Sequence, residues 1–257
     1  MTTNALWIAF ATMARREVSR IFRIWTQTIL PPVITTALYF LVFGGFLGSR
    51  IGSIGGVSYF TFIVPGLIML GVITNAFSNV SSSAYMAKFQ RNIEEVLVAP
   101  VPAWIIVLGY SSGGVLRGLM IAGIITAVTS IFMTLPFVHV GIILASILLT
   151  TLMFSLMGLV AGLYSKSFDQ MNIVPTFVLT PLTYLGGVFY SAGSLSGWAS
   201  TLTHWNPIYH IVDLFRYGFT GVASVNPLIG LLVLLVGTLA FGGWSYWIVS
   251  SGRGLKA

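Results

Sequence analysis

The stretch YFTFIVPGLIMLGVITNAFSNV, residues 59–80, carries no charged side chain and is long enough to cross a lipid bilayer. A helix that spans the hydrocarbon core needs about 20 largely apolar residues. Five further stretches of the chain have the same character. They are Ile29–Leu47, roughly Gly118–Phe137, Gly141–Leu163, Ile173–Tyr190 and Pro227–Val249. The sequence therefore predicts an all-α membrane protein with six transmembrane helices.

The composition excludes a water-soluble globular protein. Of the 257 residues, 56% are apolar and 7% are charged, and the mean hydropathy is +0.96. A soluble domain carries about a quarter of its residues as charged side chains, so lipid must surround most of this chain. The net charge of +7 does not indicate nucleic-acid binding, because the basic residues are too sparse to follow a phosphate backbone. The absence of cysteine excludes disulfides, thiolate metal sites and a cysteine nucleophile.

Lysine and arginine are distributed unevenly between the two sides that six spans define. The side that holds both termini has Arg15, Arg16, Arg20, Arg23, Lys88, Arg91, Lys166, Arg253 and Lys256, whereas the other side has Arg50 and Arg216. Segments rich in lysine and arginine stay in the cytoplasm, so we expect both termini to be cytoplasmic. The remaining residue, Arg117, is expected to extend toward the cytoplasmic head groups. A functional intramembrane arginine is the alternative.

Glycine and proline within the spans predict local geometry. Pro181 lies inside the fifth span and predicts a kink. The pairs Gly109/Gly113 and Gly158/Gly162 have the spacing that lets two helices approach closely. This spacing identifies no partner helix for either pair.

Residues Ala5–Trp25 have the pattern of an amphipathic helix in the cytoplasmic membrane interface. Its apolar face consists of Trp7, Phe10, Ala14, Val18, Ile21 and Trp25, and its polar face of Thr12, Arg16, Ser19, Arg20 and Arg23. Such a helix places its apolar side in acyl chains and its arginines among anionic head groups. A simple topology anchor is the alternative, but it explains the arginines without the periodicity.

Met86–Pro102, which follows the second span, is the most charged segment of the chain. Phe89, Ile93, Val96 and Leu97 share one helical face, and Lys88, Arg91, Glu94 and Glu95 supply the charge. An apolar ridge with a charged rim is typical of a short helix that docks in a groove of a soluble partner. A solvated loop is the alternative interpretation.

Ser191–Val225, before the last span, is too apolar for a solvated loop and too interrupted to span the membrane. Within it, Asn206, His210, Asp213 and Tyr217 form a polar stripe. Asp213 and Arg216 are three residues apart, so we expect them to neutralise each other as a structural pair on the outer side. This pattern predicts a re-entrant or interfacial helix. A catalytic role for Asp213 and His210 would require a second acid or a nucleophile nearby.

Five segments, in this order, resemble the membrane permeases of ABC-2 type ABC transporters. They are RIWTQTILPPVITTALYFLVFG (23–44), FIVPGLIML (62–70), FQRNIEEVLVAPVP (89–102), VPTFVLTPLTYLGGVFYS (174–191) and HWNPIYHIVDLFRYGFTG (204–221). The resemblance covers essentially the whole chain and points to a group of bacterial inner-membrane transport permeases. It implies one transmembrane domain, residues 1–257, with an N-terminal interfacial helix (5–25), a cytoplasmic coupling helix (86–102) and outer re-entrant helices (191–225) before the last span.

The resemblance also implies the partners. We expect a homodimer in the bacterial inner membrane that joins two copies of a separate ATPase, which binds ATP and Mg²⁺. This chain lacks a GxxxxGK[ST] loop, so we expect it to have no catalytic residue, cofactor or metal of its own. The coupling residues would be Phe89, Arg91, Ile93, Glu94, Glu95 and Leu97. Membrane lipids are the remaining expected partner.

A translocation path is expected between the first, second and fifth spans of the two copies. Its candidate residues are Tyr39, Phe43, Asn75, Asn79, Phe177, Thr180, Tyr184 and Phe189. These uncharged aromatic and polar groups suit export of an amphipathic, lipid-like or drug-like substrate. One alternative is an ion-coupled secondary transporter, which needs an ionisable group at mid-membrane. The other is an integral membrane enzyme, for which His139, His204, His210 and Asp213 are the candidates.

Overall fold

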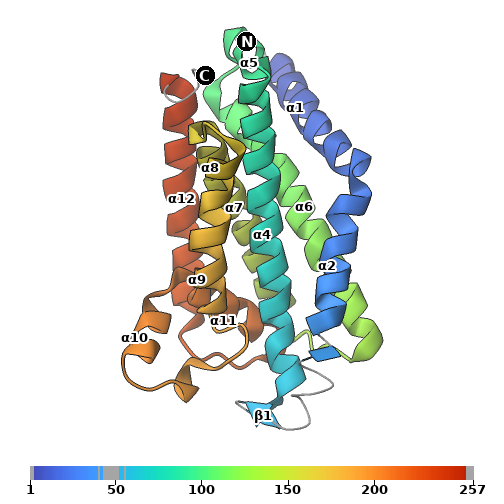
Figure 1. Ribbon diagram of the computed structural model, residues 1–257, viewed down its shortest axis with the longest axis vertical. Helices are drawn as coiled ribbons and strands as arrows, with labels where there is room; N and C mark the ends of the chain where they lie inside the picture. The colour runs from blue at the N-terminus through green and yellow to red at the C-terminus, as the bar shows by residue number, and fades with distance from the viewer. Residues whose placement is uncertain (1–2, 40, 43–51, 55, 253–257) are drawn as a thin grey trace.

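The computed structural model describes residues 3–39, 41–42, 52–54 and 56–252 as a bundle of long helices (Figure 1). The helices before the middle of the chain are α1 (Thr3–Arg23), α2 (Trp25–Tyr39), α4 (Tyr59–Phe89), α5 (Asn92–Val98) and α6 (Ala103–Phe132). Those after it are α7 (Val140–Tyr164), α8 (Phe168–Ile173), the π-helix η2 (Val174–Leu179), α9 (Thr180–Tyr184), the 3-10 helix η3 (Ala192–Ser194), α10 (Trp198–Trp205), α11 (Pro207–Thr220) and α12 (Pro227–Ser251). Two short antiparallel strands, β1 (Ser53–Ile54) and β2 (Val57–Ser58), precede α4.

Within the described residues, four helices are long and apolar enough to cross a membrane, namely α4, α6, α7 and α12. Together with the apolar composition, they identify a multi-pass helical membrane protein. The first expected span, Ile29–Leu47, begins in α2 and continues beyond the described residues. The fifth, Ile173–Tyr190, is divided among the end of α8, η2, α9 and a following turn. The arrangement of six spans therefore stays a prediction.

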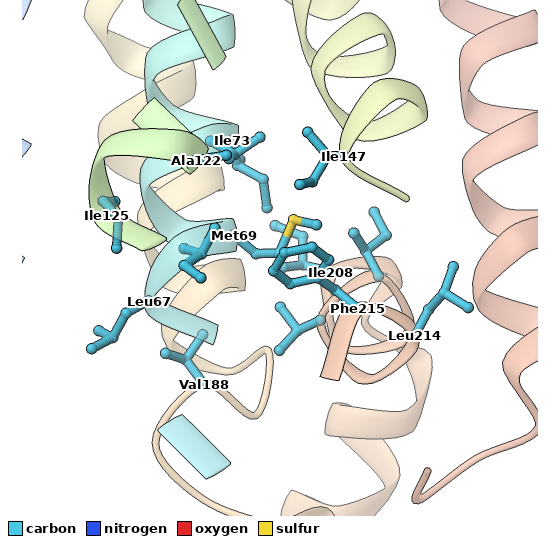
Figure 2. Close-up of a cluster of buried hydrophobic side chains, with 14 of the residues drawn as sticks. Leu67, Met69, Ile73, Ala122, Ile125, Ile147, Val188, Ile208, Leu214 and Phe215 are labelled. Carbon is cyan, nitrogen blue, oxygen red and sulfur yellow. The ribbon is translucent and has the colours of Figure 1, made fainter. Parts of the chain in front are cut away.

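Helix α4 is the centre of the bundle. In its most apolar stretch 67% of the residues are buried, against 17% in α12, so α4 is enclosed by protein and α12 lies at the periphery. It packs against α6 and α7 along its length, and α11 covers the half of α4 that begins at Tyr59. Figure 2 shows the resulting core, in which Met69 and Ile73 of α4 meet Ala122 of α6, Ile147 of α7 and Phe215 of α11.

The glycine pair of α7 forms the contact with α4. A Cβ atom at Gly158 would collide with the carbonyl oxygen of Phe77, and one at Gly162 with that of Ser81. Only a residue without a side chain allows the two backbones this close approach, as in other membrane helix pairs.

Two helix ends differ from the expected ones. Helix α6 begins at Ala103 and ends at Phe132 rather than Phe137, because Pro136 favours an extended conformation in the residue before it. Helix α9 ends at Tyr184 rather than Tyr190, and Gly187 follows it in the left-handed region, with φ of 68°. Glycine adopts this conformation at little cost, so the chain turns there instead of continuing as a helix.

The expected disturbance at Pro181 takes the form of a π-helical turn. Pro181 has no N–H, and its ring excludes the carbonyl group of Phe177 from its usual position. The helix widens over η2, where both the N–H and the hydroxyl of Thr180 donate to the carbonyl oxygen of Pro175, the hydroxyl at 2.8 Å. Short π-helical segments of this kind are frequent at functional sites.

Candidate functional site

A buried carboxylate joins the N-terminal helix α1 to the bundle. Glu17 is 1% exposed, and the hydroxyl of Ser83 lies 2.8 Å from each of its carboxylate oxygens. Arg20 Nη2 lies 3.0 Å and Arg16 Nη2 3.4 Å from the same carboxylate. Partial burial lowers the pKa of Arg16, but Tyr110 and Glu17 raise it by more, so the net shift is upward. These contacts compensate a charge that has been removed from water.

The glycine pair of α6 forms the surface on which α1 packs. A Cβ atom at Gly109 would lie 2.8 Å from Cβ of Met13, and one at Gly113 would lie 2.9 Å from Cβ of Glu17. Both distances are shorter than an ordinary carbon–carbon contact. The absence of side chains on α6 therefore brings the Glu17 carboxylate into the bundle.

The expected division of α1 into a lipid face and a head-group face is wrong at one position. Ile21 is 1% exposed and packs inside the bundle, although the sequence pattern assigned it to the acyl chains. Arg16 and Arg20 both contact Glu17, but their side chains stay 45% and 30% exposed, so the expected polar face is kept there. The physical reason is that α1 meets protein as well as lipid. Trp7 and Trp25 remain exposed, as an interfacial helix requires.

Two arginines from different helices converge on Asn79 of α4. Arg20 donates to its carbonyl oxygen at 2.8 Å, and Arg117 of α6 contacts its side-chain oxygen at 3.5 Å. The Nε atoms of both arginines are buried and have no hydrogen-bond partner among the described residues. The expected extension of Arg117 toward the cytoplasmic head groups stays a prediction, because the structure contains no membrane. The Arg117 guanidinium lies between helices, within the bundle.

Beside Arg117, a groove of about 340 Å³ lies between α2, α4 and α6. Its polar lining consists of Gln27, Thr35, Thr36, Tyr39, Thr74, Asn75, Ser78 and Arg117. Its apolar and glycine lining consists of Pro31, Pro32, Leu67, Leu70, Gly71 and Ile125. A concave surface that combines apolar walls with a few polar groups is typical of a small-molecule site.

The structure brings four of the eight candidate path residues to this groove or its rim. Tyr39 and Asn75 line it directly. The hydroxyls of Tyr39 and Tyr184 are 3.3 Å apart. The Phe189 ring is tilted against Tyr39 and stacked on Tyr184, at 5.7 and 5.9 Å between centroids. This aromatic cluster links α2 to the segment around α9.

The other four path candidates have different positions. Asn79 is fully buried and reaches the groove only through Arg117. Phe177 and Thr180 are exposed, and Phe177 has 73% of its surface accessible, so both are available to lipid or to a second copy. Phe43 lies outside the described residues.

The expected coupling segment forms the end of α4, a tight turn and the short helix α5. Arg91 directly precedes α5, and its backbone lies in the left-handed region, with φ of 60°. Phe89 is 70% exposed and Val98 is 87% exposed, and the acidic side chains Glu94 and Glu95 are also exposed. In Figure 1 this segment lies at the end of the bundle where α1 begins and α12 ends.

The apolar ridge of this segment differs from the expected one. Ile93 is 2% exposed and packs in a cluster with Val80 and Ile105 of the same chain. It therefore anchors α5 to the bundle rather than presenting itself to a partner. Phe89 and Val98 provide the exposed apolar surface instead. The side chain of Leu97 lies outside the described part of the chain.

At the other end of the bundle, Asp213 and Arg216 of α11 are both buried and their charged groups are 3.5 Å apart. Asp213 also accepts the backbone N–H groups of Ser224 and Val225 at 2.9 and 3.0 Å, which fixes the connection to α12. The ion pair with Arg216 and the two backbone hydrogen bonds thus give the Asp213 carboxylate a structural role. This geometry disfavours the alternative of an enzyme with Asp213 as catalytic acid.

Arg216 joins three segments at this end of the bundle. It donates to the carbonyl oxygens of Phe62 at 3.1 Å and Gly187 at 2.6 Å, and its guanidinium lies 3.8 Å from the centre of the Phe62 ring. Burial lowers the pKa of Arg216 to about 10, although Asp213 acts in the opposite direction. At neutral pH the guanidinium is therefore protonated and makes all of these contacts.

Sequence reasoning missed Glu17, which connects α1 to α4 and α6. One signal was present: Glu17 is the single acidic residue of α1, and Arg20 follows it at the spacing of one helical turn. A lone carboxylate among arginines indicates an internal partner when the helix packs on protein. The pattern of apolar residues did not reveal this packing.

Comparison with known proteins places this geometry in a family context. Residues 8–220 match the family of ABC-2 type transporters. The chain is 50% identical over 253 residues to the inner membrane transport permease YadH of Escherichia coli K12, and the match covers 98% of each protein. It is also 24% identical over 233 residues to nodulation protein J of Neorhizobium galegae, with 90% and 88% coverage, and 25% identical over 211 residues to nodulation protein J of Rhizobium meliloti, with 82% and 79% coverage.

Proposed function

The chain belongs to the ABC-2 type transporter family, and from this premise we propose that it forms a homodimer that exports an amphipathic, lipid-like or drug-like substrate. It is a transport permease, the non-catalytic membrane subunit of an ABC transporter of the inner membrane, and it works with an ATPase partner. The observation that carries this conclusion is the 50% identity to a transport permease over nearly the whole of both chains. In our proposal each of the two copies binds one ATPase subunit, and ATP and Mg²⁺ are bound there.

The segment around α5 is the proposed contact with the ATPase. What supports this is its exposed apolar pair, Phe89 and Val98, next to the acidic pair Glu94 and Glu95. Apolar anchors supply most of the binding free energy of such contacts, whereas rim charges orient the partner. Because Ile93 fixes α5 to the bundle, a displacement of α5 by the ATPase would be transmitted to α4 and α6.

The groove between α2, α4 and α6 is the proposed start of the translocation path. Its mixture of apolar walls, hydroxyl and amide groups supports an amphipathic substrate. Export requires two states of the dimer in which the path faces opposite sides of the membrane, and ATP must favour one of them. In this proposal α1, α5 and both termini are cytoplasmic, and α10 and α11 lie at the outer side.

The coupling contact can be tested by placing a charge on its exposed apolar residues, Val98 and Phe89. We expect Val98→Asp and Phe89→Asp to reduce recovery of the ATPase with the affinity-tagged permease by about tenfold or more, since loss of an apolar anchor costs about 2 kcal/mol. Both side chains are exposed in the permease, so insertion into the membrane should be unaffected. The measurement is co-purification from detergent, followed by ATP hydrolysis.

Val222→Asp is the matched control, because Val222 is also exposed but lies between α11 and α12. It should leave ATPase recovery at the wild-type level. Glu94→Lys combined with Glu95→Lys should weaken assembly less than Val98→Asp, and more clearly at low salt. If Val98→Asp and Phe89→Asp both retain normal recovery and hydrolysis, this segment is not the coupling contact.

A further inference from the structure

Arg117 is a positive charge inside the bundle that has no ionic partner among the described residues. It belongs to a membrane-spanning helix, and it takes part in none of the ion pairs among the described residues. Its contacts there are one long hydrogen bond, 3.5 Å to the side chain of Asn79, and a buried Nε without a partner. A charge that is removed from water and left uncompensated is costly, and intramembrane arginines usually mark a path or a ligand.

The surroundings of Arg117 add to the excess of positive charge. Arg20 approaches the same asparagine from α1, so two guanidinium groups converge on Asn79. The carboxylate of α1, Glu17, is already engaged by Ser83, Arg20 and Arg16. Arg16 and Arg20 therefore share this carboxylate, and Arg117, which lines the groove, is not among its partners.

The groove offers a charged part and an apolar part side by side. Within the described residues of its lining, Arg117 is the one charged side chain. Leu67, Leu70 and Ile125 form part of the apolar wall of the same groove. The neighbouring polar residues are uncharged and cannot neutralise the arginine. Thr74 and Asn75 donate to the carbonyl oxygens of Leu70 and Gly71 of α4, and among the described residues the hydrogen bond of Arg117 goes to Asn79 instead.

We propose that the groove binds an amphipathic molecule whose anionic head group, a phosphate or a carboxylate, pairs with Arg117 while its apolar part lies against α2, α4 and α6. The guanidinium suits this ligand because its planar donors match the oxygens of phosphate and carboxylate. The inference deepens the proposed function and rests on it, since it gives the transported amphiphile a negative charge. It also identifies the role of Arg117 as recognition of the head group.

The test compares two probes that differ only in the head group. The complex of the permease with its ATPase is reconstituted in phosphatidylcholine nanodiscs and labelled with a photoreactive dodecyl phosphate. Unlabelled dodecyl phosphate and unlabelled dodecylphosphocholine then compete for labelling. We expect labelled peptides from α2, α4 and α6, and competition by dodecyl phosphate at about tenfold lower concentration. Equal competition by the two compounds would overturn the proposal without any mutation.

Variants assign the effect to one side chain. Arg117→Gln should lower labelling at a given probe concentration about tenfold, and Arg117→Lys should keep part of it, because the charge remains but the planar fork is lost. Arg15→Gln is the control, since it removes the same charge from an exposed position on α1 that lines neither the groove nor the Glu17 cluster. Unchanged labelling in a correctly assembled Arg117→Gln complex would overturn the proposal.

Two further arms identify the source of the head group. If phosphatidylglycerol in the nanodisc suppresses labelling, an anionic membrane lipid occupies the site. If it does not, the site is reserved for another amphiphile, and both results support an anionic site. Inorganic phosphate should not compete, and competition at the concentration of dodecyl phosphate would contradict a role for the apolar part.

Recovery of the ATPase in the same samples separates the two proposals. If the ATPase is not recovered with the permease, the result counts against the proposed function. If it is recovered and both head groups bind equally, the result counts against this inference alone.

Discussion

Glu17 links α1 to α4, because its carboxylate accepts from Ser83 of α4 and pairs with Arg20, which itself donates to the carbonyl oxygen of Asn79. We expect Glu17→Gln to lower the free energy of unfolding by about 1–3 kcal/mol, the usual cost of leaving buried polar groups without a partner. The loss is smaller than for a fully buried ion pair, because the Arg16 and Arg20 side chains are 45% and 30% exposed. Arg20 and Arg16 would then repel each other without a carboxylate between them. The measurement is thermal unfolding of the purified permease in detergent.

Glu95→Gln is the matched control for this change. Glu95 lies on α5 and is exposed, and no ion pair among the described residues involves it. Its substitution should alter the free energy of unfolding by no more than about 0.5 kcal/mol. Equal effects of the two substitutions would show that Glu17 is not a structural carboxylate.

Residue-level predictions from the sequence succeeded where both partners lie on one helix and failed where they lie on different helices. The spacing of Asp213 and Arg216 was sufficient to predict their proximity, since three residues along a helix bring side chains together. Glu17 and Ser83 are far apart in the sequence, and no local pattern relates them. For the same reason, Arg117 could be placed on a helix but not next to Asn79.

At the scale of elements, the packing of α1 on α6 depends on the glycine pair of α6. We expect Gly113→Ala to destabilise the permease by about 1–3 kcal/mol, because the added Cβ would lie 2.9 Å from Glu17 Cβ and 3.0 Å from Asn79 Nδ2. Glu17 Cβ is fixed to the backbone of α1, so relief of that contact requires α1 to move away. Thermal unfolding and proteolysis of α1 both report this separation.

Gly123→Ala tests the same substitution on the same helix in open space. No atom lies within 4 Å of a Cβ atom at Gly123. Alanine is the better helix former by up to about 1 kcal/mol, so this variant should be as stable as the wild type or slightly more stable. If Gly113→Ala behaves like Gly123→Ala, α1 does not rest on this part of α6.

Elements with continuous apolar character were predicted well from the sequence, and interrupted ones were not. The expected second, fourth and last spans lie within α4, α7 and α12, because apolar length alone defines a membrane helix. The ends of α6 and α9 were misplaced, since Pro136 and Gly187 act on the backbone and leave the apolar run intact. Glycine spacing predicted close packing but not which helices pack, because spacing describes one surface of a contact and not its partner.

At the scale of the whole molecule, the two ends of the bundle differ in charge. The end with α1 and α5 carries the exposed basic and acidic side chains of both segments, whereas the opposite end has the buried pair of α11 and the mainly apolar α10 (Figure 1). Exposed charges at the end of α1 and α5, and a neutralised pair at the end of α11, are consistent with a cytoplasmic position of the end with α1 and α5. The same orientation is needed for α5 to meet an ATPase, because ATP is cytoplasmic.

This orientation predicts which end reacts with a reagent that cannot cross the inner membrane. The natural chain has no cysteine, so a single introduced cysteine reports one position. Thr201→Cys, exposed on α10, should react in intact cells with a membrane-impermeant maleimide added from outside. Glu94→Cys, exposed on α5, should react only after the inner membrane is opened, and Ile63→Cys, fully buried in α4, should stay unreactive in both samples. If Glu94→Cys reacts in intact cells and Thr201→Cys does not, the assigned orientation is reversed. That result would also exclude contact of α5 with a cytoplasmic ATPase, because a segment on the outer side of the membrane cannot reach that partner.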